Sequence, residues 1–185
     1  MSSGGRSRRE RRPHRSGLCG TQVPGVARRA PQHPVSSAQV VFGRIDPMEI
    51  AYLMDDAPTE EELIALYTSV GWTAYTANTT MLHAAIAGSS AVVTARDHGR
   101  LVGLARVISD GQTIVYLQDI LVEPSHHRTG IGRELMQRVI APFDHVRQKV
   151  LLTDDDPAQR SFYESAGFTC TESHDPQLRA FVRLG

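Results

Sequence analysis

The stretch from Glu123 to Leu135 constrains this chain most, because it places two glycines, Gly130 and Gly132, at the start of a helix. A β-rich run ends at Pro124, a polar and basic loop follows, and an apolar stripe with helical spacing begins near Gly130. The N–H groups in the first turn of a helix have no partner within the helix, so they can bind an anion. The sequence therefore predicts a phosphate-binding loop at this position.

The residues before this loop predict a strand, two helices and then three strands. Apolar spacing, capping signals and glycines indicate a strand over 48–54, helices over 59–70 and 78–87, and strands over 91–96, 101–109 and 113–123. Asp110-Gly111 is a strong hairpin signal, so the last three strands form an antiparallel meander. The segment 71–75 carries Trp72 and Tyr75, which either wall a substrate pocket or anchor the loop by burial.

The residues after the loop predict one parallel crossover. The continuous apolar run 150–152 is typical of a strand buried on both faces, and helix 130–140 connects it to strand 113–123. Three further elements are expected: a short helix from Asp156-Pro157 to Gly167, a strand from Phe168, and a strand over 178–184. The predicted class is α+β, with a mixed, mostly antiparallel central sheet flanked by helices.

The formal net charge of zero hides an uneven distribution. Residues 1–40 hold eight arginines and one acidic residue, a net charge of +7, whereas the remainder holds 12 basic and 19 acidic residues, a net charge of −7. The Arg-, Ser-, Gly- and Pro-rich composition predicts a disordered extension over 1–40 before a domain over 41–185. An arginine cluster can bind nucleic acid, which is the weakest of the functional alternatives.

Other features bear on compartment and cofactors. Cys19 and Cys170 lie in segments of different character, which favours a reducing, cytoplasmic setting over a disulfide scaffold. No apolar run approaches the ~20 residues of a membrane-spanning helix, so no membrane partner is expected. His126 and His127 lack a third metal ligand nearby, so no metal site is expected.

Two nucleotide-binding motifs compete for the glycine loop. A Walker A loop requires a lysine after its second glycine, and the chain's only lysine is Lys149. A Rossmann fingerprint requires a third glycine where Leu135 stands, and it follows a parallel rather than an antiparallel strand arrangement. Asp154 does lie about 20 residues onward, as the Rossmann motif expects, so that motif stays open as a weaker alternative.

Two motifs resemble those of the GNAT N-acetyltransferases. Pro124 to Leu135 resembles the family's acyl-CoA-binding motif, Gln/Arg-x-x-Gly-x-Gly/Ala, with His127 at the first position instead of Gln or Arg. Ser161 to Phe168 resembles the family's closing Phe-Tyr-x-x-x-Gly-Phe block, and 101–106 resembles its third strand. The resemblance covers residues 48–184 and implies the acyl-CoA N-acyltransferase fold.

The resemblance also implies an activity and its binding residues. The expected enzyme moves an acetyl or other acyl group from acetyl-CoA to a small-molecule or peptide amine by direct attack, with a homodimer as an option. A non-catalytic acyl-CoA-binding sensor is the alternative. The expected coenzyme-binding residues are Ile120, Leu121, Val122, His127, Arg128, Thr129, Gly130, Ile131, Gly132, Arg133 and Asp156.

Two residues are candidates for proton transfer. Tyr163 matches the family tyrosine that faces the coenzyme sulfur and can protonate it; the alternative is a buried aromatic beside Phe162. An amine of the lysine type has a pKa of about 10.4, so it must lose a proton before it attacks. Asp119 is the candidate base, with Glu123 and Tyr116 as weaker choices, and a structural or substrate-orienting carboxylate is an equal alternative.

Overall fold

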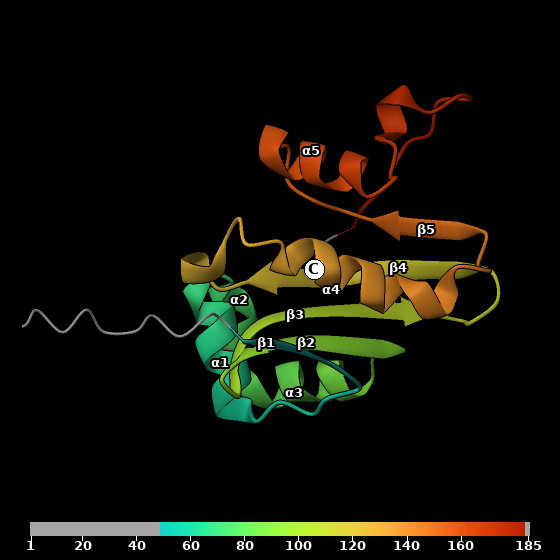
Figure 1. The fold of residues 1–185 in the computed structure, drawn as a ribbon. Helices are drawn as coiled ribbons and strands as arrows, with labels where there is room; N and C mark the ends of the chain where they lie inside the picture. Colours follow the sequence, from blue (N-terminus) through green and yellow to red (C-terminus); the bar gives the residue numbers. More distant parts are fainter. Residues whose placement is uncertain (1–48, 184–185) are drawn as a thin grey trace, which may run out of the picture. The chain divides into compact units, whose positions relative to one another are not determined.

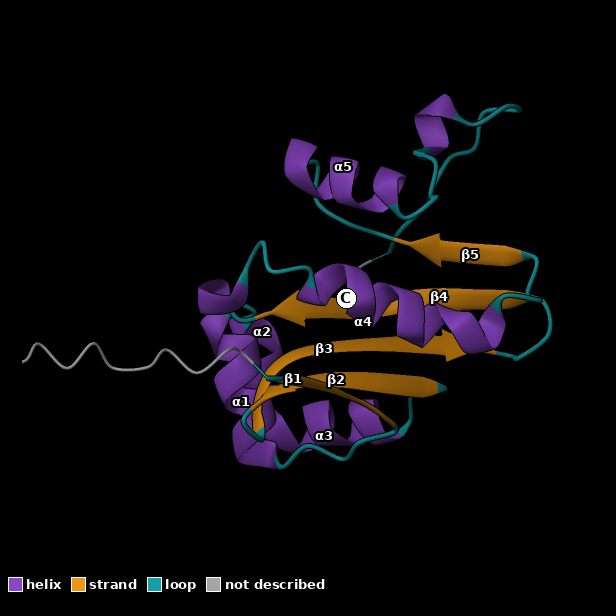
Figure 2. Ribbon diagram, viewed as in Figure 1, coloured by secondary structure: helices purple, strands orange, loops and turns teal. Residues whose placement is uncertain are grey.

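The computed structural model describes residues 49–183, which form one mixed sheet with helices on its faces (Figures 1 and 2). The sheet order is β1-β2-β3-β4-β5, antiparallel except for the parallel β4–β5 pair. The strands are β1 (Ile50–Met54), β2 (Ala91–Asp97), β3 (Arg100–Ser109), β4 (Ile114–Val122) and β5 (Gln148–Leu151). The helices are α1 (Glu60–Ser69), α2 (Thr73–Thr76), α3 (Thr79–Ala87), α4 (Ile131–Ile140) and α5 (Pro157–Ser165). The α+β class predicted from the sequence is confirmed.

Local capping explains where several elements begin. Thr59 and Glu62 form the expected capping box at α1, with the Glu62 N–H donating to Thr59 Oγ1 at 3.3 Å and the Thr59 N–H donating to Glu62 Oε2 at 3.0 Å. The Asn78 side chain caps α3 in a similar way, by accepting the Met81 N–H. In the β3–β4 hairpin, the Asp110 carboxylate accepts the N–H groups of residues 112–114, which fixes the turn.

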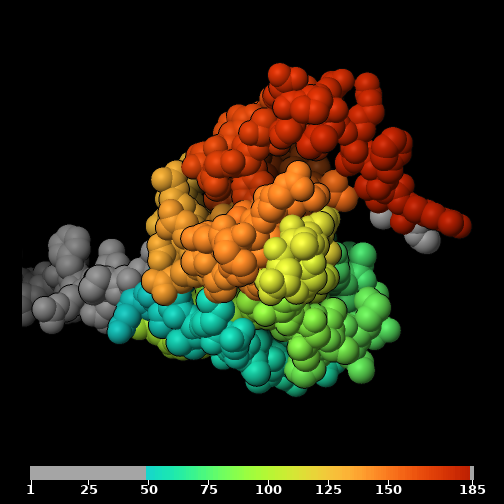
Figure 3. All heavy atoms as spheres, turned by 90° about the vertical axis from the view of Figure 1, so that its right-hand side faces the viewer, coloured from blue at the N-terminus to red at the C-terminus, as the bar shows by residue number. Residues whose placement is uncertain are grey.

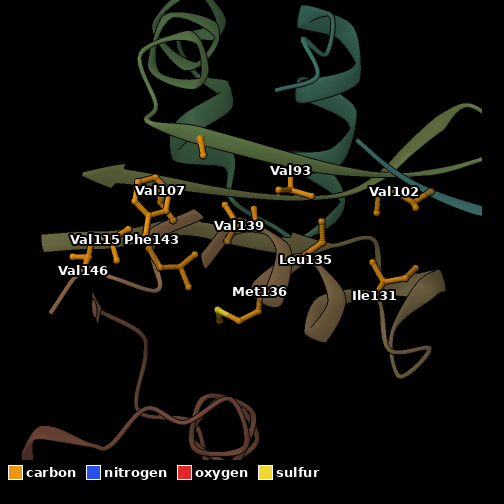
Figure 4. Packing of buried hydrophobic residues seen from close by; sticks show 14 residues of the cluster. Val93, Val102, Val107, Val115, Ile131, Leu135, Met136, Val139, Phe143 and Val146 are labelled. Atoms are coloured by element: carbon orange, nitrogen blue, oxygen red, sulfur yellow. The ribbon is translucent and has the colours of Figure 1, made fainter. Parts of the chain in front are cut away.

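Two hydrophobic cores lie on opposite faces of the sheet. On one face α4 inserts Ile131, Leu135, Met136 and Val139 against valines of β2, β3 and β4, as Figure 4 shows. On the other face α1 and α3 pack Leu63, Tyr67, Leu82 and their neighbours against β2, β3 and β4. These are the apolar stripes that the sequence periodicity predicted to be buried, except that Met81, expected inside on α3, is 52% exposed.

Gly103 in β3 allows α4 to approach the sheet closely. A Cβ atom at this position would lie 3.0 Å from Leu135 Cδ1, 3.3 Å from Ile131 Cγ2 and 3.3 Å from the Leu121 carbonyl oxygen. Only glycine leaves this space to the helix side chains. The close approach sets the depth at which the first turn of α4 lies over the sheet.

The β4–α4–β5 crossover is confirmed, but two predictions about its surroundings are wrong. The apolar run at β5 predicts burial on both faces, yet β5 is only partly buried because β4 is its single neighbour in the described chain. The segment 71–75, predicted as a loop, contains the short helix α2.

The two strands predicted after α5 are absent from the described residues. The segment from Phe168 is followed by a 3₁₀ turn over Thr171–Ser173 and then by extended chain without strand pairing (Figure 2). Its alternating apolar residues Leu178 and Val182 are exposed, and Figure 3 shows this terminal part, in red, extending outward. Alternation indicates a strand only where a neighbouring strand supplies hydrogen bonds, and the Leu178 N–H donates to the Thr171 carbonyl instead.

The predicted extension over 1–40 lies outside the described residues. Between residues 49 and 183, no helix combines the length and apolar character needed to cross a bilayer.

Replacing Gly103 with alanine should destabilise the protein, because the added Cβ pushes against α4 and the β4 backbone. We expect the free energy of unfolding to fall by about 1–3 kcal/mol, the usual cost of overpacking. Urea denaturation measures this change. Gly132→Ala is the matched control, since its Cβ would meet its nearest neighbours at 3.6–3.8 Å, an ordinary contact distance. Equal stability of the two variants would contradict the close approach.

Candidate coenzyme-binding and acyl-transfer site

The loop between β4 and α4 presents free backbone donors. After a 3₁₀ turn over Pro124–His126, Arg128 and Gly130 take positive φ angles of 62° and 92°, and Gly130 is the left-handed N-cap of α4. No side chain caps this helix, and the bond from the Glu134 N–H to the Gly130 carbonyl at 3.1 Å closes its first turn. The N–H groups of residues 131–133 therefore stay open to an anion, which the helix dipole also favours.

Side chains of the predicted loop residues have two different uses. Arg128 and Arg133 are exposed, so their guanidinium groups can add positive charge beside the open N–H groups. His127 Nε2 lies 2.8 Å from the Val122 carbonyl oxygen, and Thr129 Oγ1 donates to the His126 carbonyl at 2.6 Å. His127 thus fixes the loop to the end of β4, and Thr129 fixes it to the 3₁₀ turn that precedes it.

The two motifs singled out in the sequence meet in space. A Cβ atom on Gly132 would lie 3.6 Å from the ring of Phe162 on α5 and 3.8 Å from Val122 Cγ2 on β4. Phe162 and Tyr163 also pack against the core on the α4 face. The glycine loop and the Phe-Tyr block are separated by about thirty residues of sequence, yet they border one place at the end of β4.

Strand β4 leaves β5 at this place. Its parallel pairing with β5 ends at Leu117–Leu151, and Gln118 is the extra residue of a bulge against β3. Beyond the bulge the Glu123 N–H donates to the Val102 carbonyl on β3. By the alternation of a strand, Ile120 and Val122 turn their backbone groups away from β3, toward the side that β5 has left.

One predicted binding residue on β4 does not fit this geometry. Leu121 pairs with Leu104, and its backbone groups point toward β3 because they share the direction of Glu123. Its side chain is buried in the core on the opposite face from α4. Leu121 is therefore a packing residue, and the prediction that it binds coenzyme is not supported by its backbone direction.

Tyr163 lies on α5, partly buried against the core on the α4 face. Its ring is edge-on to those of Phe162 and Phe168, with centroids 5.2 Å and 6.2 Å away. Burial raises the pKa of its hydroxyl above the ordinary value, although a hydrogen bond involving Thr153 partly opposes the shift. The hydroxyl is therefore protonated at neutral pH, as a proton donor must be.

Asp156 serves first as the N-cap of α5. Its Oδ1 accepts the N–H groups of Ala158 and Gln159 at 2.8 and 2.9 Å, and Pro157 occupies the first helical position. The predicted contact of Asp156 with the pantetheine arm stays a prediction. The cap itself orients the helix that carries Phe162 and Tyr163.

Asp119 is buried in an ion pair on the α1 face of the sheet. Its carboxylate oxygen Oδ2 accepts hydrogen bonds from the Tyr67 hydroxyl, at 2.8 Å, and from Arg106 Nε. Its side chain is 1% exposed, and Oδ1 has no hydrogen-bond partner among the described residues. Burial and the neighbouring carboxylate raise the pKa of Tyr67 far above its ordinary value, so the tyrosine stays a donor. This geometry matches the structural alternative for Asp119, because Oδ2 is paired and the unpaired Oδ1 is shielded from an amine by burial.

Tyr67 and Arg106 were missed by the sequence reasoning. Arg106 did carry a signal, because an arginine inside the apolar run 101–108 must find a buried partner. Tyr67 lies 52 residues from Asp119 and belongs to an ordinary helix stripe, so its contact had no signal in the sequence.

Aromatic side chains surround this ion pair on the same face. The rings of Tyr67, Trp72 and Tyr75 contact one another, with centroids 5.6–5.9 Å apart. Gln118 Nε2 lies 3.4 Å from the Tyr75 hydroxyl. Trp72 and Tyr75 are half-buried, as the anchoring alternative predicted. Gln118 connects this aromatic wall to the point where β4 leaves β5.

A separate cavity of about 260 Å³ lies between β1, β2 and the end of α4, lined by Tyr52, Met54, Val93, Arg138, Ala141 and Pro142. None of the predicted site residues lines it. Within residues 49–183, no group of three or more His, Cys, Asp or Glu side chains is arranged so that it could hold a metal ion.

Comparison with known proteins identifies the family of this chain. The family model described as "Acetyltransferase (GNAT) domain" matches residues 55–184. The chain therefore belongs to the GNAT acetyltransferase family, which the sequence motifs had indicated.

Solved structures share the fold. A GNAT-family acetyltransferase of Streptococcus pneumoniae TIGR4 is 29% identical, with a TM-score of 0.66 over 74% of this chain and 98% of the other. A GNAT-family protein of Xanthomonas campestris pv. campestris is 28% identical, with a TM-score of 0.58 over 72% and 94%. An aminoglycoside N-acetyltransferase solved with CoA shares the fold at 15% identity and a TM-score of 0.58, over 75% and 96%.

A curated protein of Gibberella zeae that bears the name of an acetyltransferase is 40% identical over 57 residues. That alignment covers 29% of this chain and 32% of the relative, so it spans about a third of the relative's length.

Removing the cation from the buried pair should be costly. Arg106→Met leaves the Asp119 carboxylate buried without its partner, and we expect the free energy of unfolding to fall by about 3–5 kcal/mol. The triple variant Tyr67→Phe, Arg106→Met, Asp119→Leu removes all three polar groups and should recover most of that loss. Urea denaturation measures both. An Asp119→Asn variant that keeps its stability and loses turnover would instead support the base role.

Proposed function

We propose that this chain transfers an acetyl group from acetyl-CoA to a primary amine by direct attack. The observation that carries the proposal is the meeting of Gly132, Phe162 and Val122 at the open edge of β4. A phosphate cradle, an unpaired strand edge and a protonated tyrosine border this one place, and together they supply the groups that acyl transfer from a coenzyme thioester requires.

The residues present fit acetyl-CoA as the cosubstrate. The open N–H groups of residues 131–133 would hold the pyrophosphate, and Arg128 and Arg133 would add charge. The backbone groups of Ile120 and Val122 would pair with the amides of the pantetheine arm. The Val122 carbonyl already interacts with His127, so we expect its N–H to be the group that the ligand uses. The solved aminoglycoside N-acetyltransferase with CoA has the same fold.

The reaction needs little covalent chemistry from the protein. The neutral amine nitrogen bonds to the thioester carbonyl carbon and loses one proton to water, the bond from that carbon to sulfur breaks, and the sulfur takes a proton. A backbone N–H at the open edge of β4 would stabilise the charge that develops on the carbonyl oxygen. The Tyr163 hydroxyl would donate the proton to the leaving sulfur.

The two carboxylates that were candidate bases, Asp119 and Glu123, are both held in ion pairs. Asp119 is paired and buried, and Glu123 is held by Arg100 at 2.7 Å. Burial raises the pKa of Glu123, but hydrogen bonds from Arg100 and Ser125 outweigh this and lower it. Burial and the nearby Tyr75 raise the pKa of Tyr116, so this hydroxyl keeps its proton at neutral pH. We therefore propose that the ammonium group loses its proton to water.

The acceptor would approach from the α1 face. Trp72, Tyr75, Tyr116 and Gln118 are partly exposed there, beside the point where β4 leaves β5. A small-molecule or peptide amine fits this wall, and the net charge of −7 beyond residue 40 favours a cationic substrate over an anionic one. We also propose that residues 41–185 form the catalytic domain, that the protein acts in the cytoplasm, and that it forms a homodimer.

An amine panel tests the activity and separates it from a coenzyme sensor. Wild-type protein with acetyl-CoA and each amine should release free thiol, and mass spectrometry should show an acetylated product. The rate should rise with pH, because the neutral fraction of an amine with a pKa of about 10.4 grows as protons are lost. Tight acetyl-CoA binding with no thiol release for any amine would support the sensor and contradict the enzyme.

Replacing Tyr163 with phenylalanine tests the general acid. We expect kcat to fall by up to about a hundredfold, at the low end of general-acid effects because a thiolate is already a good leaving group. The affinity for acetyl-CoA should stay within twofold or so, since the ring packing against Phe162 and Phe168 is kept. Tyr52→Phe, on β1, is the matched control with unchanged turnover. An unaltered kcat for Tyr163→Phe would remove the hydroxyl from the mechanism.

A further inference from the structure

A buried histidine lies directly beneath the glycine loop. His126, at the end of the 3₁₀ turn, has a side chain that is 9% exposed. Its Nε2 lies 3.0 Å from Asp97 Oδ2, and its Nδ1 lies 3.1 Å from Glu123 Oε2 and 2.8 Å from Ser125 Oγ. Both ring nitrogens therefore have a carboxylate oxygen within hydrogen-bonding distance.

These contacts connect the loop to two strands far apart in the sequence. Asp97 is the last residue of β2, and Glu123 follows the last residue of β4. Glu123 also accepts a hydrogen bond from Arg100 at the start of β3. His126 thus bridges the β2–β3 hairpin and the end of β4, and the glycine loop begins one residue later.

Asp97 depends on this bridge. Among the described residues, the Asp97 carboxylate makes one side-chain hydrogen bond, between its Oδ2 and His126 Nε2. Its other oxygen, Oδ1, is buried and makes no hydrogen bond. His98 approaches Asp97 Oδ1 only at 3.6 Å, from an exposed position. Buried carboxylate oxygens are costly to leave without a donor, so the bridge holds the turn strongly in one position.

The same residue continues into the loop through its backbone. The His126 carbonyl accepts the Thr129 hydroxyl at 2.6 Å, and its N–H donates to the Glu123 carbonyl at 2.9 Å. Arg128 and Gly130, which follow, take positive φ angles, and these angles set the direction of the loop backbone. A displaced His126 would therefore shift the N–H groups that face the ligand.

We propose that His126 is a positioning residue for the coenzyme loop, which it holds in its binding conformation by bridging Asp97 and Glu123. It does not touch the cosubstrate, and its effect passes through residues 127–132. The inference rests on the proposed binding of acetyl-CoA by that loop. A histidine that only stabilised the fold would change all properties of the protein together, whereas this one should change coenzyme affinity and loop order.

The first test compares His126→Leu with the conservative His126→Gln. The leucine variant should raise the KM and the dissociation constant for acetyl-CoA about tenfold or more, since small misplacements of binding groups are costly, and should leave kcat nearly unchanged. Glutamine can still donate to Asp97 and should recover most of the affinity. Leu82→Ala, in the core under α3, controls for lost stability and should leave the KM unchanged.

The second test measures the conformation of the glycine loop by its susceptibility to trypsin, without enzymatic turnover. Trypsin should cleave after the exposed Arg128 faster in His126→Leu than in wild type, while cleavage after the exposed Arg147, before β5, stays the same. Acetyl-CoA should protect Arg128 in wild type. In the His126→Leu background, Asp97→Asn should add no further loss of affinity, because both changes break the same contact.

The outcomes separate the two proposals. Wild-type protein that neither binds nor uses acetyl-CoA would refute the proposed function. Wild-type binding together with an unchanged KM and unchanged Arg128 cleavage in His126→Leu would refute the positioning role alone. The positioning role would also be refuted if Leu82→Ala raised the KM as much as His126→Leu did.

Discussion

The site depends on the break in strand β4. Up to Leu117 the strand is paired on both sides, and from Gln118 onward it keeps β3 and loses β5. A bulge at the same residue changes which face its buried side chains reach, so Leu117 lies in the α4-side core and Leu121 in the opposite one. One local irregularity thus frees backbone hydrogen-bonding groups on one side and turns Asp119 toward α1. Both sides of the site are arranged around that break.

The proposed phosphate cradle would act through backbone geometry more than through side-chain charge. Glycine at 103 lets α4 lie close to the sheet, and glycine at 130 provides the left-handed N-cap. The two positions require the same residue type for different physical reasons. The departure at His127 from the family's usual Gln or Arg is compatible with this scheme, because its ring fixes the loop to Val122 and the open N–H groups come from α4.

Among the described residues, buried polar side chains pair at two places on this sheet. Arg106 and Asp119 face each other across the strands, and His126 lies between Asp97 and Glu123 at the strand ends. Buried pairs contribute little net stability but specify geometry, since an unpaired charge is far more costly than a displaced apolar contact. The first pair orients the aromatic wall, and the second lies beneath the coenzyme loop.

The sequence by itself determined the elements whose signals are local: the capping box at Thr59, the Asp110 turn, the apolar stripe of α4 and the glycine loop that precedes it. It also indicated the family, because two motifs lie in one order along the chain. The tertiary structure alone decided which of these residues meet. The burial of Asp119 by Tyr67, the backbone direction of Leu121 and the bridge at His126 depend on register and on contacts between distant strands. The prediction of two strands after α5 was wrong for the same reason. A strand needs a neighbouring strand, and its own sequence does not specify one.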